Sequence, residues 1–344
     1  MRAKVIYVLA VFLIGIYSCQ NLAIHPDEQL DEHFFLKVDK QSLPIRVCGN
    51  LSENKIIVIL HGGPCASSII YRRDYVKEFT EKRLAIAYWG QRYAGTSQGN
   101  GGSHDIRVFS DDLKKVIQVL KSKYGQEVQV YLMAHSWGGF VAPLFLTDES
   151  KQELVSGWIQ ADGTHNYQLN DSLTHQKLLE FGHREISLNR NKKKWQKIVD
   201  FCQSHHFNES FKVARQLVAF AHEAERMLPE INQPNFQFFL TFTSNNASAS
   251  AQLTNLIMSE NILRIDQNAY KIPISENLHK IEIPCLMLWG EYDIICPTGL
   301  MEDIIRNMAH ADISHRVFEN SGHSPMFSEA EAFWNEVVDW VIRN

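Results

Sequence analysis

The chain has 344 residues, of which 45% are hydrophobic and 21% are charged, and its formal net charge is -5. This length and composition predict one large globular core that carries an insertion, and they exclude a chain that is disordered throughout. The negative net charge argues against nucleic acid as a partner, because phosphate binding needs a basic surface that releases counterions. A small molecule or a peptide is therefore the expected partner, and the oligomeric state is left open.

The first 18 residues have the organisation of a signal peptide. Basic residues precede an apolar run from Val5 to Tyr17, and Ser18 and Cys19 follow it. The run is too short to span a bilayer comfortably, and a small residue before cysteine resembles the lipobox of bacterial lipoproteins. We therefore expect export to the bacterial cell envelope and attachment to a membrane by a lipid on Cys19. Tyr17 is larger than a strict lipobox prefers, so cleavage without lipidation and an uncleaved anchor stay open as alternatives.

Short apolar runs alternate with helical patterns along much of the remaining chain. Strands are expected at 55–61, 84–89, 128–134, 155–161, 285–289 and 316–318. A helix that is capped by Ser110 and ended by Gly125 follows the second run, and another helix covers 138–147. Alternation of this kind predicts an α/β fold with a mostly parallel sheet flanked by helices.

The strand pattern is interrupted between about His165 and Ser275, where helical spacing of apolar residues takes over. We expect an inserted helical cap over 165–275. It separates a first core segment at 19–164 from a second core segment at 276–344.

A serine stands at the junction between a predicted strand and a predicted helix, in Ala134-His135-Ser136-Trp137-Gly138. Small residues two before and two after the serine let the strand and the helix approach closely around a strained turn. This pattern predicts a nucleophile elbow that raises the Ser136 hydroxyl above the sheet, beside backbone N–H groups at the start of a helix. The alternative is a serine that only caps the helix.

Two backbone N–H groups are expected to stabilise an oxyanion beside this serine. Trp137 is the first donor, because it starts the helix that follows Ser136. Gly63, in the loop after the strand at 55–61, is the preferred second donor, with Gly62 as an alternative and a plain tight turn as the other interpretation. His61 and His135 are expected to be structural side chains at crowded loop starts.

The acid and the histidine that complete such a site are expected late in the chain, in the order serine, acid, histidine. Asp293 and His323 each follow one of the last two predicted strands. His323 would take the proton of Ser136 and return it to the leaving group, while Asp293 would hold the imidazole in one tautomer. Asp162, at the end of an earlier strand, is the rival acid.

Several segments together resemble the proline iminopeptidases, serine peptidases of the α/β-hydrolase superfamily. The matching segments are His61-Gly62-Gly63-Pro64, Gln91-Arg92 with Gly95 and Ser97, Ser136-Trp137-Gly138, Gly290-Glu291-Tyr292-Asp293 and Ser321-Gly322-His323. The resemblance covers most of the mature core. It implies an α/β-hydrolase fold, the triad Ser136, Asp293 and His323, oxyanion donors at Gly63 and Trp137, and peptides with a free N-terminus as substrates.

Departures from that family's motifs leave the fold intact and blur the expected specificity. Cys65 replaces a glycine, Gly90 an aspartate, Tyr93 a glycine, and Ala134-His135 a pair of glycines. We therefore expect an aminopeptidase that acts on small peptides, with an esterase or lactonase for small acyl substrates as the alternative. A lipid-anchored binding protein without activity is the third hypothesis, because a fold alone does not prove catalysis.

Carboxylates in the expected cap could bind the ammonium group of a substrate, as they do in aminopeptidases of that family. The candidates, each of which we otherwise expect on a solvated helix face, are Glu180, Glu185, Glu223 and Glu225. No metal or other cofactor is expected, because the adjacent pair His205-His206 lacks the spacing of helical ligands. No disulfide framework is expected either, since cysteines in apolar runs, such as Cys285, are more often small buried hydrophobes.

Overall fold

The structure is a computed structural model that describes residues 29–99, 103–232, 259–272, 274–308 and 311–344. The predicted signal peptide and the predicted lipidation site Cys19 lie outside these ranges, as does the part of the predicted cap at 233–258. Within the described ranges, no helix combines the length and the apolar character that a membrane span requires.

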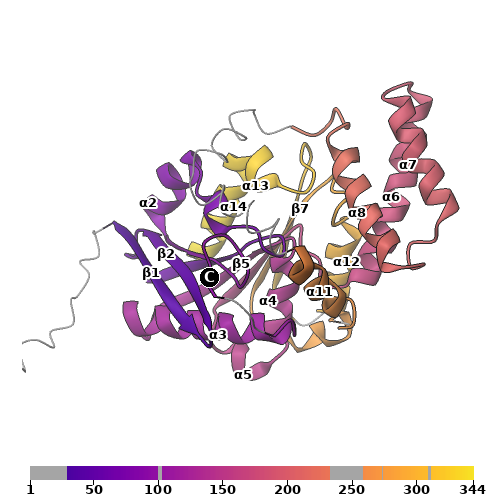
Figure 1. The fold of residues 1–344 in the computed structure, drawn as a ribbon. Coiled ribbons are helices and arrows are strands. Elements are labelled where there is room, and N and C mark those ends of the chain that lie inside the picture. Colours follow the sequence, from indigo (N-terminus) through magenta and orange to yellow (C-terminus); the bar gives the residue numbers. More distant parts are fainter. Residues whose placement is uncertain (1–28, 100–102, 233–258, 273, 309–310) are drawn as a thin grey trace, which may run out of the picture.

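A mostly parallel sheet forms the centre of the molecule (Figure 1). Within the described ranges its eight strands are β1 Leu30–Val38, β2 Gln41–Gly49, β3 Lys55–Leu60, β4 Ala85–Trp89, β5 Gln129–His135, β6 Gly157–Ala161, β7 Cys285–Gly290 and β8 Ile313–Phe318. Their spatial order is β1-β2-β4-β3-β5-β6-β7-β8. In this spatial order, every neighbouring pair from β4 through β3 to β8 is parallel. The pairs β1–β2 and β2–β4, at one edge, are antiparallel. The predicted α/β fold is confirmed.

Helices cover both faces of this sheet. Outside the segment between β6 and β7, the described helices are α2 Glu81–Arg83, α3 Arg107–Tyr124, α4 Gly138–Leu146, α5 Glu149–Gln152, α12 Gly299–Asn307, α13 Pro325–Ser328 and α14 Ala330–Arg343, with short turns η1 Ser68–Tyr71 and η2 Val76–Thr80. A further short turn, η3 Ser275–Lys280, lies shortly before β7. One face packs against α3 and α4 through Leu113 and Phe140, and the other packs against α14 through Phe333. Strand side chains alternate between the faces, so the neighbours Val58 and Ile59 belong to different cores.

Two features differ from the sequence-based expectation. Helix α3 begins at Arg107 and not at Ser110. The side chains of Ile106 and Phe109 are buried, so the residues just before Ser110 are anchored in the core as the first turn of the helix. The Ser110 hydroxyl accepts a hydrogen bond from Lys151 Nζ at 3.0 Å and caps nothing. The sequence patterns also do not predict the antiparallel hairpin of β1 and β2.

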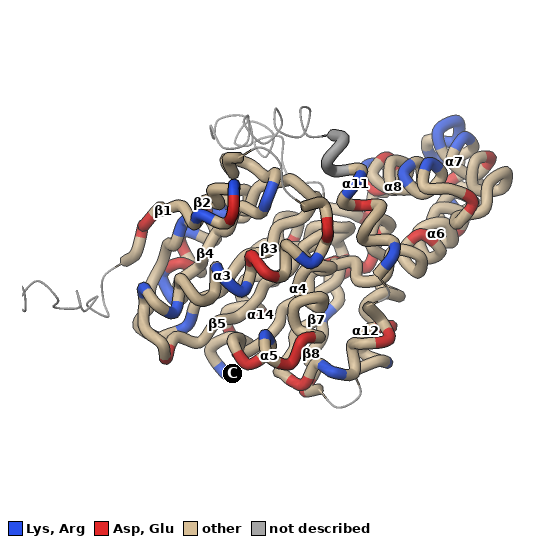
Figure 2. The backbone as a smooth tube through the Cα atoms, turned by 60° about the horizontal axis from the view of Figure 1, so that its bottom comes forward, with Lys and Arg blue, Asp and Glu red and all other residues tan. Residues whose placement is uncertain are grey.

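Between β6 and β7 the described chain is helical. Its longer helices are α6 Tyr167–Ser187, α7 Lys192–Ser204, α8 Phe211–Glu225 and α11 Ser259–Ala269, which we call the helical insertion. Buried side chains such as Leu178, Trp195 and Phe220 join α6, α7 and α8. Figure 1 shows these three helices at the opposite end of the molecule from β1 and β2. Lys and Arg residues gather at the outer end of α7 (Figure 2).

Candidate active site

The predicted site residues lie in loops at the carboxyl edge of the sheet. Ser136 follows β5, Asp293 follows β7, and His323 follows β8. The loop after β3 brings Gly62 and Gly63 to the same edge. Because parallel strands end at one edge of a sheet, loops that are far apart in the sequence meet there.

Ser136 occupies a sharp turn between β5 and α4. Its φ is 54°, in the left-handed region that is strained for a residue with a side chain. Gly138 needs its lack of a side chain, since a Cβ there would collide with the carbonyl oxygen of Leu60 in β3. Close contact between α4 and the sheet therefore holds the turn in the geometry expected of a nucleophile elbow.

Ser136, His323 and Asp293 form a continuous series of hydrogen bonds. Ser136 Oγ donates to His323 Nε2 at 2.9 Å, and His323 Nδ1 donates to Asp293 Oδ2 at 3.0 Å. The other carboxylate oxygen, Asp293 Oδ1, accepts from the backbone N–H groups of Ile295 and Cys296 at 2.8 Å each. The acid is thus fixed by its own loop, and the imidazole is aimed at the serine.

Asp162, the rival acid, lies next to Asp293 but forms no hydrogen bond with His323 within the described residues. It is fully buried, and its Oδ1 accepts from the Gly290 N–H at 2.8 Å. Burial, and then the charge of Asp293, raises the pKa of Asp162 well above its ordinary value, so its neutral form is favoured. The geometry therefore selects Asp293 as the partner of the imidazole.

The charge state of His323 depends on opposing effects. Burial lowers its pKa, but the charge of Asp293, the hydrogen bond between them and the charge of Glu225 outweigh burial. The net result is a pKa of His323 that is raised above 6.5. The imidazolium that forms when His323 takes a proton is stabilised by its surroundings.

The predicted oxyanion donors are free to bind. Neither the Gly63 N–H nor the Trp137 N–H has a hydrogen-bond acceptor among the described residues. The alternative donor, the Gly62 N–H, donates to the Tyr71 hydroxyl at 3.2 Å. Gly62 nevertheless packs against the serine, because a Cβ there would lie 3.1 Å from Ser136 Cβ. This arrangement favours the pair Gly63 and Trp137.

A hydrogen-bond network through Tyr71 and His135 joins the loops around the serine. His135 Nε2 donates to the His323 carbonyl oxygen at 2.9 Å, so its Nδ1 accepts from the Tyr71 hydroxyl at 2.7 Å. Burial, and then the charge of His323, lowers the pKa of His135 to about 3, so the ring stays neutral. No sequence motif marks Tyr71, so its role is not predicted from the sequence. The contacts of His135 are structural, as expected.

Gln91 links the loop after β3 to Trp137. Its Nε2 donates to the His61 carbonyl oxygen at 3.1 Å, and its Oε1 accepts from the Trp137 indole at 3.0 Å. The His61 ring donates from Nδ1 to the Gly62 carbonyl oxygen at 2.7 Å and accepts at Nε2 from the Gln91 N–H at 3.3 Å. Burial lowers the pKa of His61 to about 4, so this ring is also neutral and structural.

A cavity of about 600 Å³ lies over the serine. Its walls include Ser136, His323 and Gly63 from the core and Val218 and Glu225 from α8. The space above the serine is thus bounded on one side by the helical insertion.

Glu225 is the carboxylate of the insertion that reaches this cavity. Its Oε1 accepts from the Ile294 N–H at 2.8 Å, and its Oε2 accepts from the His323 N–H at 3.1 Å. Burial, and then the charge of Asp293, raises the pKa of Glu225 to about 8. A sequence signal for this position exists, because Glu225 follows the buried residues Leu217 and Ala221 of α8 at helical spacing.

The expectation of a solvated face is wrong for Glu185 and Glu225. Glu185 is fully buried and accepts from Arg184 at 2.8 Å and from Arg190 at 2.5 Å. Glu185 in the interior and Glu225 at the cavity each accept hydrogen bonds from donors that replace water. Glu180 is exposed, as expected, and pairs with Lys177.

No group of three or more His, Cys, Asp or Glu side chains is placed to hold a metal ion in the part of the chain that the structure describes. The pair His205-His206 makes local contacts, with His205 Nδ1 3.2 Å from the Phe201 carbonyl oxygen and His206 Nδ1 2.5 Å from Asn208 Oδ1. The described cysteines are buried free thiols, Cys285 among them.

Comparisons with known proteins identify the family of the chain. The family model described as serine aminopeptidase, S33, matches residues 52–235, which is more than half of the chain. The probable aminopeptidase YbaC of Bacillus subtilis (strain 168) is 24% identical over 292 residues, which are 82% of this chain and 87% of that protein.

Solved structures share the fold. The proline iminopeptidase of Mycobacterium smegmatis has a TM-score of 0.63 at 14% identity, over 91% of this chain and 98% of that one. An esterase from Exiguobacterium antarcticum has a TM-score of 0.59 at 19% identity, over 90% of this chain and 99% of that one. The chain belongs to the serine aminopeptidase S33 family and is an α/β-hydrolase similar to the proline iminopeptidases.

Proposed function

We propose that the chain is a serine hydrolase with Ser136 as nucleophile, His323 as general base and Asp293 as the acid that orients it. Ser136 Oγ attacks the substrate carbonyl carbon while His323 Nε2 takes its proton, and the same proton then passes to the leaving group. Water hydrolyses the acyl-enzyme along the same proton path. The N–H groups of Gly63 and Trp137 stabilise the oxyanion. The 2.9 Å contact between Ser136 Oγ and His323 Nε2 supports this proposal.

We further propose that the substrates are small peptides with a free N-terminus, and that residues 165–275 form the cap that selects them. One observation carries this proposal, the presence of the Glu225 carboxylate in the cavity over Ser136. Burial raises the pKa of Glu225, which means that its carboxylate form lacks a compensating positive charge. An ammonium group that enters the cavity would supply that charge and form a charge-assisted hydrogen bond with the carboxylate. The similarity to a probable aminopeptidase supports the same substrate class.

The test compares alanine and proline p-nitroanilides with their N-acetylated forms. We expect the free amines to be favoured by about tenfold or more in kcat/KM, the equivalent of one charge-assisted contact. Ser136→Ala should abolish turnover and labelling by a fluorophosphonate probe, whereas the exposed control Ser187→Ala should keep both. Labelling that persists in Ser136→Ala would refute the nucleophile. Equal turnover of free and acetylated amides would refute the aminopeptidase.

An esterase or lactonase for small acyl substrates is the second candidate. Apolar side chains form much of the cavity wall, including Ile70, Val218, Ile231 and Phe327. Hydrolysis of short p-nitrophenyl esters, with aminoacyl amides left intact, would favour this candidate. A chain that cleaves neither and resists the fluorophosphonate would instead be a binding protein.

We also propose that the chain is exported and anchored to a membrane of the bacterial cell envelope by a lipid on Cys19. The support is the order of basic residues, apolar run and small residue before this cysteine. Metabolic labelling with an alkyne fatty acid should mark the wild type, and Cys19→Ala should remove the label. A mature chain without label would point to cleavage without lipidation.

A further inference from the structure

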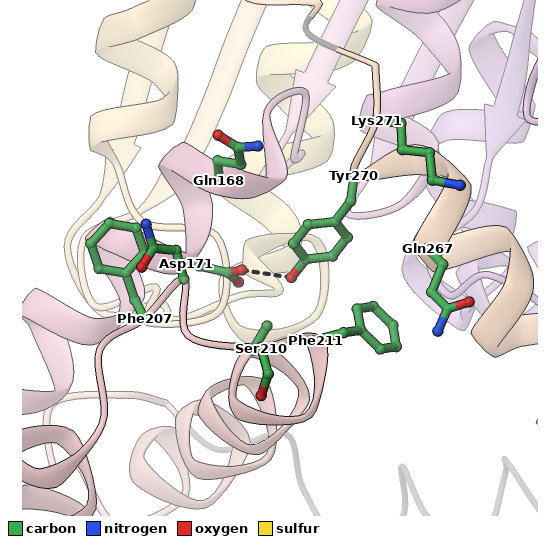
Figure 3. A pocket seen from close by; sticks show the side chains of 10 residues that line it. Gln168, Asp171, Phe207, Ser210, Phe211, Gln267, Tyr270 and Lys271 are labelled. Carbon is green, nitrogen blue, oxygen red and sulfur yellow. Dashed lines mark hydrogen bonds between the residues drawn. The ribbon is translucent and has the colours of Figure 1, made fainter.

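A second cavity lies inside the helical insertion, with a volume of about 510 Å³. Its walls come from α6, from the start of α8 and the loop before it, and from the end of α11 with the residues that follow it (Figure 3). None of its described lining residues also lines the cavity over Ser136. The volume lies in the range of small-molecule sites, about 300–1,000 Å³.

Asp171 lies in this cavity without a counter-ion. It is 3% exposed, and no Lys, Arg or His forms an ion pair with it among the described residues. The Tyr270 hydroxyl donates to Asp171 Oδ2 at 2.6 Å, while Oδ1 has no hydrogen-bond partner in the described part of the chain. Burial raises the pKa of Asp171 to about 7. A buried carboxyl group with an unsatisfied oxygen is costly unless a donor or a cation joins it.

The nearby cations of the protein are engaged elsewhere. Arg215 pairs with Asp266 at 2.8 Å. Lys271 stands at the rim, where its Nζ lies 3.4 Å from Asn268 Oδ1, and Figure 3 shows its amine pointing away from Asp171. The counter-ion that Asp171 lacks is therefore not supplied by these side chains.

Aromatic rings surround the carboxylate. Phe207, Phe211 and Tyr270 line the cavity, and Figure 3 shows Phe207 and Phe211 on either side of the Asp171–Tyr270 pair. The rings of Phe211 and Tyr270 meet edge to face, with centroids 5.4 Å apart and an interplanar angle of 82°. Ring faces attract cations, and aromatic walls beside a carboxylate are the chemistry by which proteins recognise organic ammonium ions.

We propose that this cavity binds a small organic ammonium ion, with Asp171 as its counter-ion and Phe207, Phe211 and Tyr270 as aromatic walls. Gln168 and Gln267, which line the same cavity and are exposed, contact the polar substituents of the ligand. The site is separate from the proposed catalytic centre, and it does not depend on the proposed function.

The test is calorimetric titration of the purified full chain with choline at constant ionic strength. The neutral control is 3,3-dimethyl-1-butanol, in which carbon replaces the nitrogen of choline, and n-butylammonium probes a primary ammonium. We expect at least one ammonium ion to bind, and the neutral alcohol to bind about tenfold more weakly or not at all. No binding of either ammonium ion up to about 10 mM, or equal binding of choline and the alcohol, would overturn the proposal.

The variant Asp171→Asn keeps an acceptor for the Tyr270 hydroxyl and removes the charge, so it should weaken ammonium binding about tenfold or more. The matched control Glu180→Gln removes an exposed carboxylate from the same helix and should leave binding unchanged. Circular dichroism checks folding. If Asp171→Asn does not fold, Phe207→Leu removes one wall at a half-buried position and should weaken choline binding several-fold. If whichever of these two variants folds binds the ammonium ion with wild-type affinity, the proposal is contradicted. Fluorophosphonate labelling of Ser136 tests the proposed hydrolase activity separately.

Discussion

Two buried aspartates, Asp162 and Asp293, lie near His323, and of these two only Asp293 forms a hydrogen bond with its ring. Asp293→Asn should lower kcat by about 10⁴, because an amide holds the imidazole in the wrong tautomer. Asp162→Asn should retain most of the activity, since Asp162 favours its neutral form and an amide oxygen still accepts from the Gly290 N–H. Measured kcat values for one substrate decide between them. Equal losses would contradict the assignment of Asp293 as the acid.

His323 must be neutral to accept the proton of Ser136. Since its pKa is raised above 6.5, kcat/KM should rise with pH through a midpoint above that value. Glu225 raises this pKa in its ionised form, which is the minor form near pH 7 because its own pKa is raised to about 8. Glu225→Gln should therefore move the midpoint to lower pH by a small but measurable amount. Profiles measured with an ester that has no ammonium group separate this effect from substrate binding. Glu180→Gln should leave the midpoint in place, and an unmoved midpoint in Glu225→Gln would argue against the electrostatic role.

The short turn η1 supplies Tyr71, whose hydroxyl accepts from the Gly62 N–H and donates to His135. His135 in turn donates to the carbonyl oxygen of His323. Tyr71 is thus a positioning residue that joins the loop after β3, the elbow and the histidine loop. Tyr71→Phe removes about 1–2 kcal/mol of hydrogen bonding, so kcat should fall about tenfold with KM little changed.

The matched control for this change is Tyr75→Phe, in a tyrosine that donates to Asn335 on another part of the surface. It should leave kcat and KM unchanged. A rise in KM without loss of kcat in Tyr71→Phe would show that the network serves substrate binding and not the alignment of the loops.

Strands that are buried on both sides were predictable, whereas the hairpin at one edge was not, and the opposite edge strand β8 Ile313–Phe318 was predicted only over its last three residues. The strands at 55–60 and 85–89 are fully buried apolar runs, which the sequence shows directly. The hairpin of β1 and β2 escapes because β1 lies at the sheet edge and mixes Asp31, Glu32 and Lys37 with its apolar residues. Its pairing comes from the neighbouring strands of the sheet and not from a local pattern.

The same distinction holds for the candidate site. Ser136, Asp293 and His323 each follow a strand that the sequence reveals, so their meeting at one edge could be expected. Glu225 contacts Ile294 and His323, which lie far along the chain in the second part of the core. No local pattern specifies contacts of this range, because they depend on how the insertion packs on the core.

Buried titratable groups across the whole molecule determine how its stability depends on pH. Burial raises the pKa of Asp171 to about 7 and of Asp266 to about 6, and it raises those of Asp162 and Glu225 as well. The folded chain therefore holds protons that the unfolded chain releases above about pH 4. The stability that these carboxyl groups contribute is present at low pH and is lost as the pH rises through their folded pKa values.

Two buried histidines act in the opposite direction. Burial lowers the pKa of His61 to about 4 and, together with the charge of His323, that of His135 to about 3. The unfolded chain binds protons at these rings below pH 6.5 that the folded chain does not bind. Their contribution to stability is therefore present above that pH and is lost as the pH falls.

Above pH 6.5, histidines with a lowered pKa, such as His61 and His135, no longer take up protons on unfolding, while the carboxyl groups with a raised pKa still release them. Each proton released changes the free energy of unfolding by about 1.4 kcal/mol per pH unit. Thermal unfolding followed by circular dichroism should show a melting temperature that falls between pH 6.5 and about pH 8.5. Below pH 6.5 the melting temperature should depend less on pH, because there the histidines oppose the carboxyl groups. Asp171→Asn removes one of these carboxyl groups, so its melting temperature should fall less steeply over the same interval than that of the wild type. A melting temperature that rises across this interval would mean that the buried carboxyl groups are already ionised in the folded chain, and that their charges are balanced by partners beyond those described above.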